Sequence, residues 1–259
     1  MLIVCNGAQK GGSTWIYNLA QLIRPRHKRI PDSYQQQGYR SSSISRDRIT
    51  SFVAEVDYLN YDYICKQHWY NRASVRKLAN DGNSRFIDII RDIRDVSVSR
   101  YYHDIRLENV APSIPFRDYL FDRGFAMIDH YLSYQFYWHR DHAFDDVEPL
   151  LISYEGLKID FSTSFLLIAE YLETNVSQDE ITCAHQLTDI SSLGGLSHYR
   201  KGIVGDWLNH YSPELASALE AHIRTQGYFE FLSMIKDQGV FVADDLINGN
   251  WAQLCSYRN

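Results

Sequence analysis

The chain has 259 residues, of which 45% are apolar and 22% charged, with 26 basic and 32 acidic side chains. This length suits one domain over residues 1–259, because a single core can grow to roughly 250 residues before chains tend to divide. The net charge of −6 argues against a surface dedicated to nucleic acid or to an anionic membrane. No apolar stretch approaches the roughly 18 residues of a membrane helix, no signal peptide precedes the first apolar run, and the four cysteines are scattered. We therefore expect a cytoplasmic protein without membrane or nucleic-acid partners.

Short apolar runs alternate with longer helical patterns along the chain. The runs predict buried strands at residues 2–5, 61–65, 86–90 and 150–153. The helical patterns cover residues 13–23, 95–104, 125–140, 162–172 and 213–225. This alternation is typical of parallel strands joined by crossover helices, so we expect an α/β fold with a central parallel sheet flanked by helices.

The segment at residues 31–57 has a different composition. It contains runs of three glutamines and three serines, several arginines and few large apolar residues. Such a composition favours a mobile loop or lid over a core element.

A glycine-rich turn follows the first predicted strand, with glycines at positions 7, 11 and 12. Glycines let backbone N–H groups converge, and the N-terminus of the next helix adds partial positive charge, so the turn can cradle an anion. A Walker A loop has lysine directly after its last glycine. Here Ser13 holds that position and the lysine comes earlier, at Lys10. A turn that binds no ligand is the alternative interpretation.

Three motifs, in order along the chain, carry a resemblance to a known family. Residues 10–15 (KGGSTW) resemble the KSGTTW loop of sulfotransferases that use 3′-phosphoadenosine 5′-phosphosulfate (PAPS). Residues 91–99 (RDIRDVSVS) resemble the RNPRDxxVS segment of that family, with Asp-Ile in place of Asn-Pro. Residues 200–207 (RKGIVGDW) resemble its RKGxxGDW segment. Two shorter matches agree, a KxH at residues 66–68 and YEGLK at residues 154–158, where the family has YEDLK.

The resemblance implies a P-loop-like sulfotransferase fold, PAPS as the donor and adenosine 3′,5′-bisphosphate (PAP) as the product. It assigns the 5′-phosphosulfate to the glycine-rich loop, the 3′-phosphate to two later segments and the adenine to the neighbourhood of a tyrosine. Arginine suits phosphate because its planar group can donate two hydrogen bonds. The implied donor-binding residues are Lys10, Gly11, Gly12, Ser13, Thr14 and Trp15 in the loop, Arg91, Ser99, Arg200, Lys201 and Gly202 at the 3′-phosphate, and Tyr154 near the adenine.

The implied catalytic residues are Lys10, Lys66 and His68. Sulfuryl transfer builds charge on the bridging oxygen of the leaving phosphate, so fixed positive donors are the main requirement. A divalent metal is less necessary than in phosphoryl transfer, and we expect no metal site. Lys10 would follow the leaving oxygen and Lys66 would orient the sulfuryl group. His68 would take the proton of the acceptor, since an unperturbed pKa of about 6.5 suits that work.

The acceptor is expected to be a small molecule with a hydroxyl or amino group. The acidic chain favours a neutral or cationic acceptor, and 14% aromatic residues suit either a large core or an aromatic-lined pocket. Trp69 and Tyr70, next to the KxH motif, would narrow that pocket or pack in the core. The oligomeric state stays open.

Several alternatives stay open at this stage. A nucleotide-dependent small-molecule kinase with an atypical loop is a second function, and a non-catalytic nucleotide-binding protein is a third. At the level of residues, His103 reads as structural rather than catalytic, and Trp15 and Trp207 as core anchors. Arg94 and Asp95 would form a local ion pair or a helix cap instead of touching the donor. No tryptophan for stacking on the adenine can be placed.

Overall fold

Four parallel strands form the sheet, in the order β2-β1-β3-β4. The structure is a computed structural model that describes residues 1–36, 43–68, 78, 82–139, 149–188 and 201–256. The strands are β1 (Leu2–Gly7), β2 (Tyr63–Lys66), β3 (Ser84–Ile90) and β4 (Leu150–Ser153). Each overlaps a run predicted as a strand, and the parallel pairing confirms the expected α/β fold.

Successive side chains of each strand enter two separate cores, one on each face of the sheet. Leu2 and Val4 pack in one core, whereas Ile3 and Cys5 pack in the other, and all four are fully buried. This alternation follows from the pleat of a strand. Strands buried on both faces explain why the sequence shows continuous apolar runs there.

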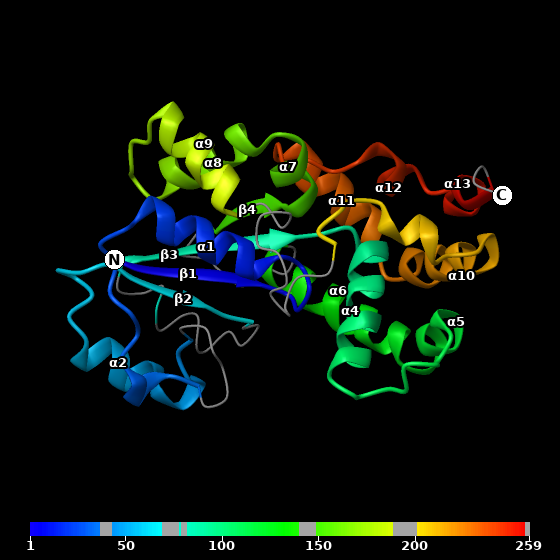
Figure 1. Cartoon of the computed structure of the whole chain (residues 1–259), viewed down its shortest axis with the longest axis horizontal. Helices are drawn as coiled ribbons and strands as arrows, with labels where there is room; N and C mark the ends of the chain where they lie inside the picture. The colour runs from blue at the N-terminus through cyan, green and yellow to red at the C-terminus, as the bar shows by residue number, and fades with distance from the viewer. Residues whose placement is uncertain (37–42, 69–77, 79–81, 140–148, 189–200, 257–259) are drawn as a thin grey trace.

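Helices cover both faces of the sheet (Figure 1). The smaller core is closed by α1 (Ser13–Ile23), α7 (Tyr154–Ile159), α8 (Phe161–Tyr171) and α9 (Gln178–Thr188). The larger core draws on α2 (Ile49–Glu55), α4 (Ile93–Arg106), α5 (Phe116–Tyr119), α6 (Phe125–His139), α10 (Pro213–Arg224), α11 (Tyr228–Asp237), α12 (Asp244–Asn248) and α13 (Trp251–Ser256). Among these described helices, none combines the length and apolar character needed to cross a membrane.

The five predicted helices correspond to α1, α4, α6, α8 and α10. The match at α10 has a clear local cause, because the Ser212 hydroxyl accepts the Leu215 N–H at 3.3 Å and Pro213 occupies the first turn. The bounds of α1 agree with the sequence pattern at both ends.

The expectation for residues 31–57 needs a correction in its described part. Residues 49–55 form α2, and Ile44, Ile49 and Phe52 are at most 1% exposed in the larger core. The glutamine and serine runs masked this apolar spacing, so part of the segment is a core element and not a loop. Residues 37–42 lie outside the described part of the chain.

Candidate active site

The glycine-rich turn joins β1 to α1 at the carboxyl edge of the sheet. Gly12 has φ +114°, and a Cβ added there would lie 2.9 Å from side-chain atoms of Ile89 and Tyr154, so glycine is required. Within the turn, the Gly11 N–H donates to the Ala8 carbonyl at 3.0 Å. No described side chain caps the N-terminus of α1. Uncapped N–H groups and the helix dipole together favour an anion at this position.

Two lysines at this turn have no carboxylate in ion-pair range among the described residues. Lys10 lies in the turn, with φ +71°, and Lys66 lies beside it. Lys66 ends β2, and its Nζ donates to the Thr14 hydroxyl at 3.1 Å. Burial, followed by the charge of Arg106, lowers the pKa of Lys10 to about 8, and burial also lowers the pKa of Lys66. Their positive charges are therefore destabilised until an anion arrives.

His68 follows β2, which ends at Lys66, by two residues. Its Nδ1 is 2.6 Å from the Gly7 carbonyl oxygen. A carbonyl only accepts, so Nδ1 carries the hydrogen and donates it. Burial, with a smaller effect of the nearby Lys66 charge, lowers the pKa of His68. The imidazole is thus neutral at neutral pH, and its unprotonated Nε2 can accept a proton.

A cavity of about 430 Å³ opens at this group of residues. Its described lining comes from the turn, the end of β2, helix α6 and the 31–57 segment. The lining residues are Ala8, Gln9, Gln36, Ser45, Arg46, Lys66, Gln67, His68, His130 and Tyr134. The cavity therefore brings the predicted base and one predicted catalytic lysine to a single space.

A second cationic position follows β3, at Arg91. Its backbone is fixed by Tyr131, whose hydroxyl accepts the Arg91 N–H and donates to the Arg91 carbonyl, both at 2.9 Å. The guanidinium lies 4.1 Å from the ring centre of Tyr154, and its Nη2 donates to the Ile203 carbonyl at 3.4 Å. The Arg91 Nε is buried without a hydrogen-bond partner in the described part of the structure. A buried guanidinium with an unused donor suits an anionic ligand.

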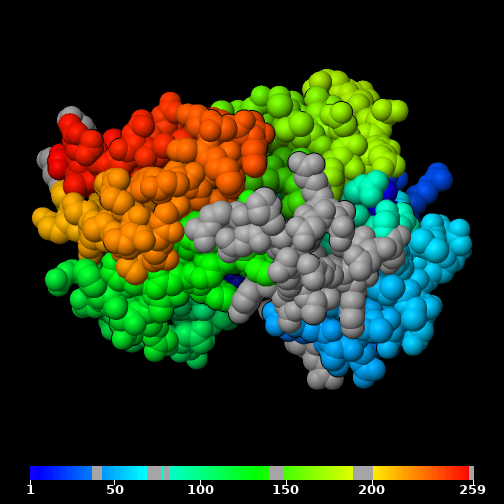
Figure 2. Space-filling view, turned by 180° about the vertical axis from the view of Figure 1, so that it is seen from behind, coloured from blue at the N-terminus to red at the C-terminus, as the bar shows by residue number. Residues whose placement is uncertain are grey.

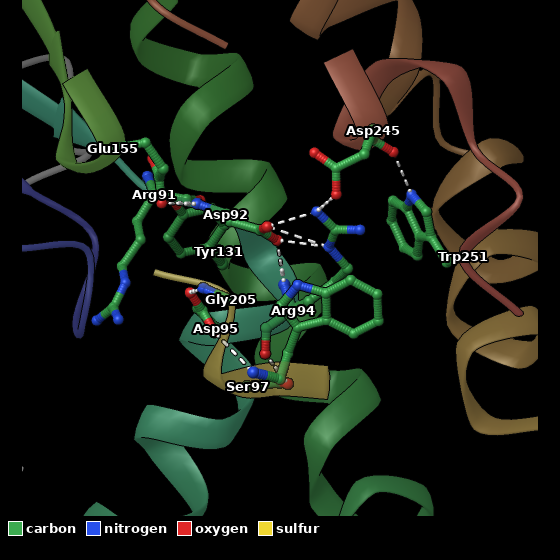
Figure 3. A network of polar contacts seen from close by, with 11 residues as sticks. Arg91, Asp92, Arg94, Asp95, Ser97, Tyr131, Glu155, Gly205, Asp245 and Trp251 are labelled. Atoms are coloured by element: carbon green, nitrogen blue, oxygen red, sulfur yellow. Dashed lines mark hydrogen bonds and ion pairs between the residues drawn. The ribbon is translucent and has the colours of Figure 1, made fainter. Parts of the chain in front are cut away.

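Asp95 holds the loop that follows residue 200. Its two carboxylate oxygens accept the N–H groups of Gly205 at 2.8 Å and of Trp207 at 2.9 Å (Figure 3). Asp95 lies in the first turn of α4 and is 1% exposed. Burial, followed by the nearby Asp92 charge, raises the pKa of Asp95 to about 6. Together with the Arg91 contact, this carboxylate fixes residues 203–207 against the start of α4.

Similarity to known proteins agrees with this geometry. Residues 2–233 match the family model described as "Sulfotransferase domain". The chain belongs to the sulfotransferase domain family. A cytosolic sulfotransferase 3 of Arabidopsis thaliana is 29% identical over 57% of this chain and 54% of the relative, and sulfotransferase 6B1 of Danio rerio is 24% identical over 49% and 47%. The chain thus spans about half the length of these curated relatives.

Two solved structures, one of them a sulfotransferase, share the fold. Mouse sulfotransferase SULT7A1 complexed with PAP has a TM-score of 0.63 at 18% identity, covering 88% of this chain and 84% of that one. Retinol dehydratase in complex with androsterone and inactive cofactor PAP has a TM-score of 0.62 at 16% identity, covering 87% and 80%.

The structure brings most of the sulfotransferase motifs to one edge of the sheet. The turn of residues 10–15, the KxH end of β2 and Arg91 follow three adjacent strands, where open α/β sheets bind ligands. Ser99 is half-buried on α4. Lys201 is 51% exposed and its Nζ pairs with Asp206 at 3.0 Å, while Gly202 has φ +63°. Arg200, Trp69 and Tyr70 lie outside the described residues.

Three residues named from the motifs lie in the protein interior. Trp15 and Trp207 are 6% and 2% exposed, which confirms the core role suggested for them. The Trp15 Nε1 donates to the Thr188 hydroxyl at 3.1 Å. Tyr154 is 4% exposed and lies 5.2 Å from the Trp15 ring, beneath Gly12. Donor contacts of Trp15 and Tyr154 stay predictions.

The departures from the family pattern have local explanations. Asp92 caps α4 by accepting the Arg94 N–H at 2.9 Å, so it retains a hydrogen-bonding role at the family's asparagine position. At Gly156, a Cβ would lie 2.8 Å from the Ser153 hydroxyl and 3.3 Å from Phe241, which makes glycine the best fit. Arg94 forms the expected local ion pair, with Asp92. Asp95 forms neither an ion pair nor a helix cap in the described structure and instead anchors the distant loop at Gly205 and Trp207.

Sequence reasoning missed residues that support the site from elsewhere in the chain. Tyr131 on α6 fixes the backbone of Arg91, and Glu155 accepts the Asp92 N–H at 3.0 Å. Tyr131 lies in no motif, and a tyrosine in a helical apolar pattern is too common to single out. Glu155 belongs to the YEGLK match of residues 154–158, but that match points to Tyr154 near the adenine and not to a contact with Asp92.

Proposed function

We propose that this protein transfers a sulfuryl group from PAPS to a hydroxyl or amino group of a small-molecule acceptor. The observation that carries the proposal is the neutral His68, hydrogen-bonded to Gly7, beside Lys66 in the same cavity. Membership of the sulfotransferase domain family supports it, since the motifs of that family supply these residues.

The residues of the donor site fit a nucleotide with anionic groups on both its 5′ and its 3′ side. The turn and Lys10 would hold the 5′-phosphosulfate, because they offer backbone N–H groups and an unpaired positive charge. Arg91, with its buried unpartnered Nε, would hold the 3′-phosphate with Ser99, Arg200, Lys201 and the Gly202 N–H. Tyr154 and Trp15 would support the adenine side. Among the described residues, no cluster of three or more His, Cys, Asp or Glu side chains could hold a metal ion.

When bound, PAPS would supply an activated sulfuryl group with PAP as its leaving group. His68 Nε2 would take the proton of the acceptor hydroxyl, and the Nδ1–H bond to Gly7 would keep the ring oriented and stabilise the imidazolium. Lys66, held by Thr14, would keep positive charge beside the transferred oxygens. Lys10 would stabilise charge on the bridging oxygen as that bond breaks.

The acceptor is proposed to be a neutral small molecule. Related sulfotransferase-fold structures contain androsterone or retinol, which shows that uncharged organic molecules fit this fold. The net charge favours a neutral or cationic acceptor. Lys66 and Arg46 in the cavity lining oppose a cation there, so the neutral class is the better fit. We place the reaction in the cytoplasm, on the similarity to a cytosolic sulfotransferase.

A test with two radiolabelled donors separates this function from the kinase alternative. The protein is incubated with labelled PAPS in EDTA, or with γ-labelled ATP and Mg²⁺, and with a panel of phenols and alcohols that includes 4-nitrophenol. We expect label transfer from PAPS, and its loss in Lys10→Met. Transfer of phosphate from ATP without sulfuryl transfer would instead establish a kinase.

A further inference from the structure

The last helices of the chain contact the motif that follows β3. The sulfotransferase domain match ends at residue 233, whereas α12 and α13 occupy residues 244–256. Seen from behind, these helices lie directly against α10 and α11 as one continuous block (Figure 2). Trp251 is fully buried, and its backbone N–H donates to Glu220 of α10 at 3.3 Å. The segment of residues 244–256, here called the C-terminal brace, is therefore part of the core.

Arg94 links this brace to the donor site. It is 1% exposed, and its guanidinium makes several bonds of 2.6–3.1 Å to the carboxylate of Asp92. Its Nη2 also donates to Asp245 of α12 at 2.9 Å (Figure 3). The Trp251 Nε1 donates to the Asp245 carbonyl at 3.0 Å, which positions Asp245 for this contact. A buried arginine thus bridges a carboxylate of the motif and a carboxylate of the brace.

The same guanidinium lies against Trp207, which belongs to the loop that follows Lys201 and Gly202 of the proposed 3′-phosphate site. Its Cζ is 4.0 Å from the ring centre of Trp207 and 4.7 Å from that of Trp251. Cation–π contact with a desolvated arginine is a favourable and directional interaction. Because the Trp207 N–H is held by Asp95, movement of the Trp207 ring would loosen the loop at residues 203–207 and its contact with Arg91.

We propose that the C-terminal brace acts on donor recognition, with Asp245 and Arg94 as positioning residues for the 3′-phosphate side of the site. This inference rests on the proposed function, since it presupposes a donor with a 3′-phosphate. Asp245 fixes Arg94, Arg94 fixes Trp207, and Trp207 fixes the loop that meets Arg91. Pre-ordering the loop reduces the entropy that donor binding would otherwise cost.

The test compares two neighbouring substitutions on α12. Asp245→Asn keeps the side-chain shape at a site that is 43% exposed but weakens the contact with Arg94. Asp244→Asn is the matched control, because Asp244 pairs at 2.6 Å with Lys236 and not with Arg94. The dissociation constants of PAP and AMP are measured for the wild type and for both variants, together with the melting temperature. Arg94→Lys, which keeps the charge but loses the planar fork, is a second variant.

For Asp245→Asn we expect a loss of affinity for PAP on the order of threefold to tenfold, with AMP binding unchanged. The KM for PAPS should rise with kcat retained, and Arg94→Lys should show the same selective loss. Asp244→Asn should leave the PAP-to-AMP ratio at the wild-type value. A ratio unchanged in Asp245→Asn, whatever its melting temperature, overturns the inference. Equal affinities for PAP and AMP in the wild type overturn the proposed function instead.

Discussion

Lys10 and Lys66, beside the glycine-rich turn, have no described carboxylate in ion-pair range, whereas Arg91 and Arg94 lie among carboxylates. Asp92, Asp95 and Glu155 are all buried near these arginines, and Asp245 joins them from α12. Burial, followed for Lys10 by the charge of Arg106, disfavours the positive charge of both lysines, and a bound anion would offset this effect. On the arginine side, Asp92 already pairs with Arg94 and Asp95 already holds the following loop, whereas the Arg91 Nε is buried without a hydrogen-bond partner in the described part of the structure.

This contrast indicates that the two sides have different roles in the proposed reaction. The hydrogen bonds on the arginine side hold the backbone of Arg91 and of the following loop in a fixed geometry. An unsatisfied group of cations binds an anion strongly and can respond to charge that develops during reaction. In the proposed function, the reactive chemistry accordingly belongs to the lysine side and recognition of the nucleotide to the arginine side.

The largest expected effect comes from removing His68, the proposed base on the lysine side. His68→Ala should lower kcat by roughly 10² to 10⁴-fold, the usual contribution of general base catalysis. Affinity for PAP should change little, because His68 is bonded to Gly7 and not to the cationic group. His130→Ala is the control, since His130 lines the same cavity. Turnover retained in His68→Ala would remove the reactive role from this side.

The lowered pKa of Lys10 predicts a pH dependence of donor binding. Its pKa of about 8 in the free protein means that Lys10 is charged below pH 8 and loses its proton above it. Affinity for PAP should therefore weaken as the pH rises through about 8, by roughly tenfold per pH unit at the limit. Lys10→Arg keeps its charge over this range and should flatten the dependence. Calorimetric titration from pH 7 to 9 measures both, and a flat wild-type profile would contradict the assignment.

Asp95→Asn tests the arginine side. The amide would present an NH₂ group toward one of the two N–H donors of the loop, Gly205 or Trp207, and so loosen it. We expect severalfold weaker binding of PAP, unchanged binding of AMP and unchanged kcat at saturating PAPS. Ser212→Ala, which removes the cap of α10 at a typical cost of about 1 kcal/mol, is a control for lost stability alone. Equal losses for PAP and AMP would show a general defect and not a loop-specific one.

The last prediction concerns the stability of the fold near Glu155, and we expect no effect on activity. Burial, followed by the Asp92 charge, raises the pKa of Glu155 from 4.5 to about 7. Between these values the folded state holds a proton that the unfolded state lacks, so the free energy of unfolding falls as the pH rises from about 4.5 to 7. Glu155→Gln keeps the acceptor for the Asp92 N–H and should remove about 3 kcal/mol of this dependence.

Denaturant unfolding at several pH values measures this dependence. The exposed Glu170→Gln on α8 should follow the wild-type curve. A Glu155→Gln variant that also follows it would show that Glu155 is ionised throughout in the folded state.

The sequence predicted the sheet and the glycine-rich turn, because these depend on local patterns. The site residues near the strand ends were implied by the family resemblance, and their roles stay predictions. Apolar runs report burial on both faces, and Ser212 with Pro213 reports a helix start. The sequence did not predict α2, since Ile44, Ile49 and Phe52 are spaced among polar residues. It also missed the links from Asp95 to Gly205 and from Arg94 to Asp245, because these residues are 110 and 151 positions apart in the chain.

The most direct test of the account is calorimetric titration of the wild type with PAP, AMP and ATP in EDTA. A site with one anion position at Lys10 and a second at Arg91 predicts tight binding of PAP and much weaker binding of AMP, which lacks the 3′-phosphate. ATP, which carries its additional phosphates on the 5′ side, should also bind more weakly than PAP. Equal affinity for PAP and AMP, or tighter binding of ATP, would contradict a site that recognises the two ends of one nucleotide.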